Sequence, residues 1–211
     1  MTEQVPLYPL APLVFVVAAV VFALLMARHL RVFAAVQPAP VRDEPGRLGS
    51  LFVYAIAQVR MFRDLDAGLL HAAIFWGFVV LTVGTADRVS FGLVHAILTA
   101  PLDGWLWRLT ILAQNVFVLS VLFGVGWALF RRLLLRAPRR MTLSRDGVVI
   151  LLLIGAVVVT EWWAEAFRIA RFGDADAGWA IAAAPLATLM GGLPAGFLEI
   201  GFGVLFWANV L

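Results

Sequence analysis

The chain has 211 residues, of which 63% are apolar and only 14% are charged. Soluble globular domains are about half apolar and about a quarter charged, so a soluble domain of this length cannot bury so much apolar surface. A lipid bilayer accommodates it, and the same composition excludes intrinsic disorder. The absence of cysteine excludes disulfides, thiolate metal sites, cysteine-ligated iron–sulfur clusters and cysteine nucleophiles within these residues.

Five apolar segments are long enough, or nearly long enough, to cross a bilayer, which takes about 20 residues for about 30 Å of hydrocarbon. They cover residues 10–27, 68–86, 105–130, 148–167 and 193–211. We therefore expect an all-α fold, an integral membrane bundle of five transmembrane helices. The first segment is expected to be a retained span, because a signal peptide carries basic residues before its apolar run and residues 1–9 have none.

Arginine is distributed unevenly among the connections. All 16 basic residues are arginine, and twelve of them lie between spans one and two or between spans three and four. Basic residues concentrate on the cytoplasmic side of multi-pass proteins, so the N-terminus is expected outside, in an inner (plasma) membrane. This topology also explains the net charge of +3 without nucleic acid as a partner. The twelve are Arg28, Arg31, Arg42, Arg47, Arg60, Arg63, Arg131, Arg132, Arg136, Arg139, Arg140 and Arg145; the other four are Arg88, Arg108, Arg168 and Arg171.

Three further segments have recognisable patterns. Residues 37–47 are rich in proline and charge, which predicts an irregular inner loop, whereas residues 48–63 alternate apolar and polar side chains at helical spacing. The latter pattern predicts a short amphipathic helix on the inner surface. The alanine-rich segment 176–190 is typical of a re-entrant or interfacial helix. Because the fifth span ends without a polar anchor, we expect the chain to be the N-terminal part of a longer protein.

His71 is an ionisable residue inside a span, and such residues are candidates for function. It lies one turn from the inner end of the second span, and Gly68, Phe75 and Phe78 share its helical face. A small residue and two aromatic rings would let a flat macrocycle lie against this face, with the imidazole bound to haem iron. A hydrogen bond from His71 to a neighbouring helix is the alternative.

Other residues at the inner side could assist such a site. His29 follows the first span at a depth similar to that of His71. It is either an interfacial residue without a special role or a haem-site residue, as a second axial ligand or as a hydrogen-bond donor to a propionate. Arg60 and Arg63 are candidates for neutralising the propionates. His95 lies in an outer connection, where a solvated side chain is expected.

Polar residues also occur in the outer halves of the spans. Gln114, Asn115, Glu161, Glu165 and Glu199 are candidates for binding a quinone head group or for proton transfer, because a buried carboxyl can hold its proton near neutral pH. For the two glutamates 161 and 165, an exposed helix terminus is the alternative.

Hydrolytic chemistry finds no support, since the sequence has no Walker loop, no HExxH motif and no paired carboxylates at catalytic spacing. Asp64 and Asp66 precede the second span and resemble the acidic cluster that favours a helix start.

The stretch from Gln58 to Leu81 contains the pattern His71-Ala-Ala-Ile-Phe75-Trp-Gly-Phe78 after a basic surface segment. This stretch resembles the cytochrome b-type membrane domain of the respiratory nitrate reductase gamma subunit. More closely, it resembles the N-terminal membrane region of heterodisulfide-reductase-related iron–sulfur proteins, including electron-transfer-flavoprotein:menaquinone oxidoreductases. The resemblance implies that His71 is an axial ligand to haem b.

The same resemblance implies one haem b, not two. In the two-haem type a second histidine stands at the position of Leu81, and its partner ligand aligns with Asn209, so both ligands of an outer haem are replaced together. The partner ligand of His71 would lie beyond Leu211. Iron–sulfur clusters would belong to a following cytoplasmic part or to a partner protein, with electron-transfer flavoprotein among the implied partners.

We therefore expect a membrane electron-transfer subunit that carries haem b between the menaquinone pool and a cytoplasmic iron–sulfur partner, as the membrane part of a quinone-linked oxidoreductase. The alternatives are a non-redox transporter, in which Gln114, Asn115 and Glu199 mark a pathway, and a scaffold subunit.

Overall fold

The computed structural model describes residues 8–34, 49–50, 52–56, 58–63, 65–90, 93–99, 104–134 and 145–210. All elements in these ranges are helical, as predicted. In chain order they are η2 (Tyr8–Leu10), α1 (Ala11–Ala34), η3 (Phe52–Ile56), η4 (Val59–Arg63), α3 (Leu65–Val89), α4 (Leu93–Thr99), α5 (Trp105–Leu133), α6 (Arg145–Phe172), η6 (Ala177–Trp179), α7 (Ala183–Met190) and α8 (Ala195–Val210). The predicted inner loop 37–47 lies outside the described residues.

Four helices are long and apolar enough to cross a membrane, which identifies a multi-pass membrane protein. These candidate spans are Ala11–Arg31, Leu65–Asp87, Trp105–Leu133 and Arg145–Phe172. The helices are longer than the apolar segments that predicted them, because arginine and glutamate are good helix formers and continue each helix past its apolar part.

The fifth predicted span is shorter than expected. Helix α8 has 16 residues, which is about 24 Å at a rise of about 1.5 Å per residue and less than the thickness of the hydrocarbon layer. A turn closed by the bond from Leu193 N–H to Met190 O precedes it, and Pro194 follows that turn, so the helix begins only at Ala195. The described residues thus form four long helices and one short apolar helix.

The prediction of one amphipathic helix over residues 48–63 is wrong. The chain forms a single π-helical turn, η3, and a 3-10 turn, η4. Gln58 separates them with a φ of 52°, a left-handed conformation that an α-helix cannot contain. Its carbonyl accepts a hydrogen bond from Met61 N–H at 2.9 Å, which starts η4. The described part of this segment thus consists of two helical residues, 49–50, and two short turns.

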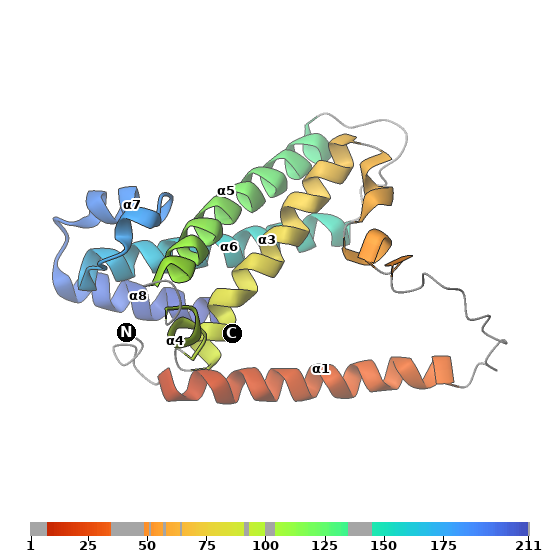
Figure 1. Cartoon of the computed structure of the whole chain (residues 1–211), viewed down its shortest axis with the longest axis horizontal. Coiled ribbons are helices and arrows are strands. Elements are labelled where there is room, and N and C mark those ends of the chain that lie inside the picture. The colour runs from red at the N-terminus through yellow and green to blue at the C-terminus, as the bar shows by residue number, and fades with distance from the viewer. Residues whose placement is uncertain are drawn as a thin grey trace.

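The helices of the bundle pack as two antiparallel pairs. Figure 1 shows α3 beside α5 and α6 beside α8, and α5 joins the pairs by its contacts with α6. One buried cluster lies between α5 and α6 around Val121 and Val158; another joins α6, α7 and α8 around Phe167 and Phe202. Helix α1 contacts α3 and α8, and its only buried side chain among residues 11–31 is Ala11.

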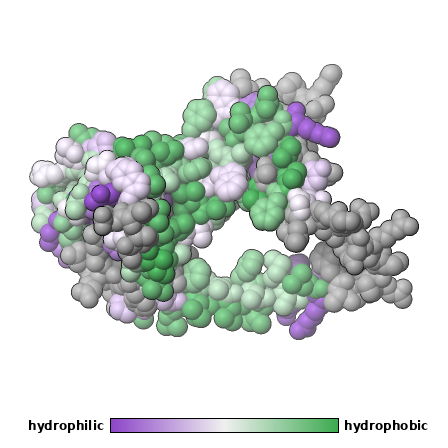
Figure 2. Space-filling model, in the orientation of Figure 1, coloured by the Kyte–Doolittle hydropathy of each residue, from purple (hydrophilic) through white to green (hydrophobic). Residues whose placement is uncertain are grey.

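The two ends of the bundle differ in charge. The end of the bundle that carries Arg63, Arg131 and Arg145 is called the arginine end below, and the end that carries α4, η6 and α7 is called the opposite end. In Figure 2 hydrophilic residues gather toward the ends of the molecule, and the surface between them is mainly apolar. This distribution fits a chain that spans a bilayer from one end to the other.

Close contact between α3 and α5 depends on a glycine. A Cβ atom at Gly77 would overlap the Cγ2 atom of Val121, whose side chain is fully buried. Valine has few rotamers on a helix, so the two helices would have to separate to make room.

We expect Gly77→Ala to destabilise the bundle by about 1–3 kcal/mol, the usual effect of overpacking. Gly126→Ala is the matched control, because nothing lies within 4 Å of the added methyl group, and alanine favours the helix by up to about 1 kcal/mol. The thermal denaturation midpoint of each purified variant in detergent measures the difference. Equal midpoints for the two variants would contradict the close packing at Gly77.

Candidate functional site

His71 stands on an open face of α3. The face of this helix that includes Gly77 packs against α5, and His71 lies to one side of it, exposed, in the second turn. Its imidazole stacks on Phe75 with 6.3 Å between ring centroids and 13° between planes. Phe78, one turn further on, is 54% exposed. The imidazole is therefore accessible from outside the bundle, on an apolar aromatic surface.

The expected role of Gly68 on this face is wrong. A Cβ atom there would overlap the carbonyl oxygen of Met61, because η4 lies directly against the start of α3. The glycine makes room for η4 and is buried, so the open surface begins at His71 and runs toward Phe78.

The arginine end beside His71 is fixed by an acidic residue. Asp66 lies in the first turn of α3, as the prediction of a helix-start cluster requires. Its carboxylate pairs with Arg131 at 2.5 Å and accepts a hydrogen bond from Trp127 Nε1 at 3.2 Å, both from α5. Arg63 is exposed on η4, whereas the side chain of Arg60 lies outside the described part. Helices α3 and α5 are thus joined at this end, and the exposed Arg63 lies close to the start of α3.

The other two histidines lie apart from His71. His29 is exposed near the C-terminal end of α1, with its Nδ1 atom 2.9 Å from Leu25 O. That end of α1 and the start of α3 diverge in Figure 1, so the structure does not bring His29 and His71 together. His95 lies on α4 at the opposite end. Its ring meets that of Trp107 edge-on, with 4.4 Å between the centroids, and its backbone N–H donates a hydrogen bond to Asp87 Oδ1 at 2.6 Å.

Leu81 and Asn209 line one cavity, here called the apolar cavity, between α3, α6 and α8. It is open to the surface of the bundle. Asn209 donates a hydrogen bond to Val157 O at 3.0 Å, which ties α8 to α6 beside the cavity. Its lining residues are Phe78, Leu81, Thr82, Thr85, Val157, Val158, Glu161 and Asn209. The two positions paired by the resemblance therefore face a common space.

A second cavity, here called the polar cavity, adjoins the first toward the opposite end. It shares Leu81 and Glu161 with the apolar cavity. The Nε2 atom of Gln114 is buried and has no hydrogen-bond partner among the described residues. Its lining residues are Leu81, Ile111, Gln114, Asn115, Val118, Glu161, Trp162, Glu165 and Ala183. Glu161 thus stands between two adjoining spaces.

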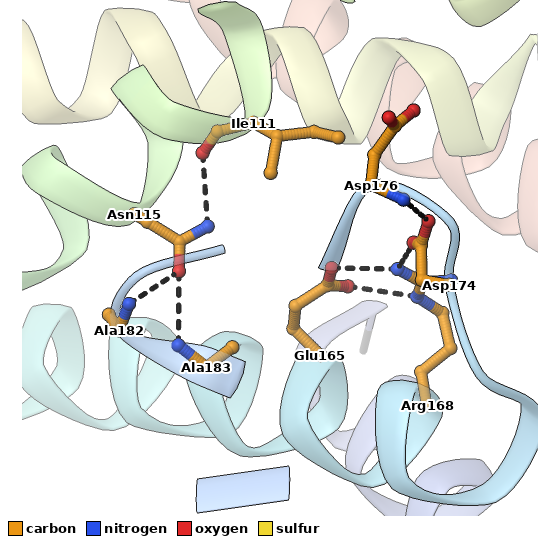
Figure 3. A network of polar contacts seen from close by, with 8 residues as sticks. All are labelled: Ile111, Asn115, Glu165, Arg168, Asp174, Asp176, Ala182 and Ala183. Atoms are coloured by element: carbon orange, nitrogen blue, oxygen red, sulfur yellow. Dashed lines mark hydrogen bonds and ion pairs between the residues drawn. The ribbon is translucent and has the colours of Figure 1, made fainter. Parts of the chain in front are cut away.

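Asn115 has a structural role. Its side chain is buried, and its Oδ1 accepts hydrogen bonds from the N–H groups of Ala182 and Ala183, both at 3.1 Å (Figure 3). Its Nδ2 donates to Ile111 O at 3.0 Å. The amide therefore satisfies the start of α7 and holds this helix, the one predicted from the alanine-rich segment, over α5.

Glu161 and Glu165 do not end a helix, because α6 continues to Phe172. The carboxylate of Glu165 binds Arg168 through both oxygens, at 3.0 and 2.8 Å, and Arg168 also pairs with Asp174 at 2.5 Å (Figure 3). The prediction of an exposed terminus is wrong, since glutamate supports the helix and the arginine gives it a partner one turn later.

Other charged residues at the opposite end are paired in the same way. Arg108 pairs with Asp176 at 2.9 Å, and Arg171 pairs with Glu199 at 3.3 Å. Of the three residues that would mark a transport pathway, Asn115 is occupied by backbone groups, Glu199 lies at the surface in an ion pair, and Gln114 alone lines a cavity.

Sequence reasoning missed both cavities. Each is formed by side chains from three or more helices, and the sequence pattern of a single helix does not contain the crossing of its neighbours. The structure shows that Gly84 on α3 faces Gln114: a Cβ atom at Gly84 would lie 3.1 Å from the Gln114 side chain.

Two curated proteins are similar to part of this chain. The EtfAB:quinone oxidoreductase of Syntrophomonas wolfei is 34% identical over 127 residues, which are 59% of this chain and 17% of that protein. The probable iron-sulfur-binding oxidoreductase FadF of Bacillus subtilis is 26% identical over 114 residues, which are 54% of this chain and 16% of that protein. The chain spans about a sixth of the length of these relatives. No family of known sequence signature and no solved structure matches it.

The chain is therefore a membrane protein related to quinone-linked iron–sulfur oxidoreductases. It has no cysteine, so cluster ligands of the usual kind are absent from these 211 residues.

We expect Asn115→Leu to loosen the start of α7, because two buried N–H groups lose their acceptor at a cost of about 1–3 kcal/mol. Hydrogen–deuterium exchange of a peptide that covers residues 180–190 should become faster in this variant. Thr188→Val is the control, since the Thr188 hydroxyl is exposed and donates only within α7, to Ala184 O. Unchanged exchange in Asn115→Leu would contradict the capping role.

Proposed function

We propose that this chain is the membrane electron-transfer part of a quinone-linked oxidoreductase, in which one haem b bound by His71 exchanges electrons with the quinone pool and with a cytoplasmic iron–sulfur partner. The similarity to an EtfAB:quinone oxidoreductase, together with an accessible imidazole on a membrane helix, carries this proposal. The name of that relative supports electron-transfer flavoprotein as the protein that exchanges electrons with the iron–sulfur partner.

The residues around His71, on the exposed side of α3, fit one side of a haem. The imidazole is exposed on α3, it stacks on Phe75, and Phe78 extends the apolar surface by another turn. His71 would hold the iron, and the two phenylalanines would exclude water from the macrocycle. Arg63 on η4, which packs against the start of α3, and Arg60 beside it would balance the propionate charges. We assign His71 one axial position only, because the end of α1 that carries His29 diverges from α3.

A bound haem b supplies reversible one-electron chemistry, which allows two-electron quinones to exchange electrons with one-electron iron–sulfur clusters. The protein contributes the axial imidazole and the apolar surroundings that set the reduction potential. In the topology expected from the positive-inside rule, the start of α3 would be on the cytoplasmic side, and His71 would lie near the face where an iron–sulfur partner docks.

We expect His71→Ala to abolish the haem b α-band in the reduced-minus-oxidised spectrum of membranes that contain the full-length protein. The control is His95→Ala, because His95 packs against Trp107 at the opposite end and is not offered as a ligand. Immunoblots of the same membranes establish equal amounts of protein. A full α-band in His71→Ala would overturn the assignment of His71, and wild-type protein without any haem would overturn the proposed function.

A further inference from the structure

The polar and apolar cavities together form a path from the apolar surface of the bundle to buried polar groups. Phe78 and Val157 line the apolar cavity from α3 and α6, and these side chains are 54% and 44% exposed. The apolar cavity therefore opens on the surface that faces lipid in a membrane. Glu161 and Leu81 line both cavities, so a molecule that enters between these helices meets Gln114 and Glu161 at its inner end.

Gln114 and Glu161 offer polar groups to such a molecule from two different helices. The amide Nε2 of Gln114 is buried and has no hydrogen-bond partner among the described residues, so its N–H groups are available to an acceptor in the polar cavity. Asn115 and Glu165 also line this cavity, but Asn115 accepts hydrogen bonds from the N–H groups of Ala182 and Ala183, and Glu165 is paired with Arg168. An apolar entrance that ends at a few convergent polar groups is typical of a small-molecule site.

We infer that these two cavities bind a quinone, with the head group between Gln114 and Glu161 and the first part of its tail in the apolar cavity. The inference rests on the proposed function for the class of ligand. A quinone matches these groups chemically, because its two carbonyl oxygens accept hydrogen bonds and its apolar tail stays in lipid. Gln114 donates to one carbonyl oxygen, and the Glu161 carboxyl donates to the other when it is protonated.

The redox step at this site balances with groups that are named here. Oxidation of the bound quinol releases two electrons and two protons (QH2 → Q + 2 e− + 2 H+), and reduction is the reverse. The electrons would pass one at a time to a one-electron carrier, for which the haem b of the proposed function would serve; Leu81 lies ten residues after His71, about 15 Å along α3. The protons exchange through the Glu161 carboxyl, which stands one turn from Glu165 on the way to the opposite end.

The proposed quinone site gives Leu81 and Asn209 a role of their own, beyond the absence of the ligands of a second haem. Leu81 and Asn209 occupy positions where the resemblance implies the ligands of an outer haem, and in this chain they line the apolar cavity. In this inference the space beside Leu81 and Asn209 holds the tail of a quinone.

Binding of a fluorescent quinone analogue, 2-heptyl-4-hydroxyquinoline N-oxide, to the full-length protein in lipid nanodiscs tests the inference. Its fluorescence is quenched on binding, which gives a Kd without any turnover. Gln114→Met removes the donor at nearly constant volume, and we expect the Kd to rise about tenfold, as for one lost hydrogen bond. Leu81→Trp fills the shared wall from another helix and should weaken binding at least as much. Asp146→Asn is the control on α6, because Asp146 lies in the first turn of that helix, at the arginine end. The Kd of this variant should stay within about twofold of the wild-type value.

The haem spectrum of the same samples separates the two proposals. An α-band of normal size with an unchanged Kd in Gln114→Met and Leu81→Trp overturns the quinone site and leaves the proposed function intact. Weaker binding in both variants supports the quinone site, whether or not a haem is present. Similar weakening in Asp146→Asn would mean that the effect is not specific to the cavities and would overturn the inference.

Discussion

Inside a bilayer, a buried N–H or C=O group must find its partner within the protein, because hydrocarbon supplies none. The helices meet this demand for most of the backbone, and threonine hydroxyls such as that of Thr82 return to the carbonyl one turn earlier. The break between α6 and α7 is the difficult place. Asn115 resolves it by accepting two hydrogen bonds from the start of α7 while donating to its own helix. The position of α7, and with it the wall of the polar cavity formed by Ala183, depends on this amide.

The sequence predicted the parts of the fold that follow from apolar length. Four long apolar runs became four long helices, since a span of about 20 apolar residues has no other low-energy form in lipid. Helix ends were predicted too short, as at Phe172, because charge was taken as the end of a helix. The turns at η3 and η4 could not be foreseen: periodicity favours a helix there, and the left-handed backbone of Gln58 has no counterpart in the pattern.

The sequence indicated most of the candidate residues, Gln114 and Glu161 included, but not the cavities that bring residues of different helices together. His71 and its two phenylalanines follow from helical spacing, and the structure places all three on one side of α3. The cavities required the crossing of α3, α6 and α8, which no single stretch of sequence encodes. The ion pairs of Arg108, Arg168 and Arg171 were missed for the same reason, since two of them join residues far apart in the chain. These pairs neutralise arginines at the opposite end and so sharpen the difference in charge between the two ends.

The attachment of α1 has a consequence for how the chain unfolds. Ala11 is its one buried side chain over residues 11–31, so a single turn supplies most of the packing free energy that joins this helix to the others. Helices α3 to α8 contain nearly all of the described buried core, so we expect α1 to detach before these helices unfold. Lateral association of α1 with a partner in the membrane would cost almost none of the stability of that core.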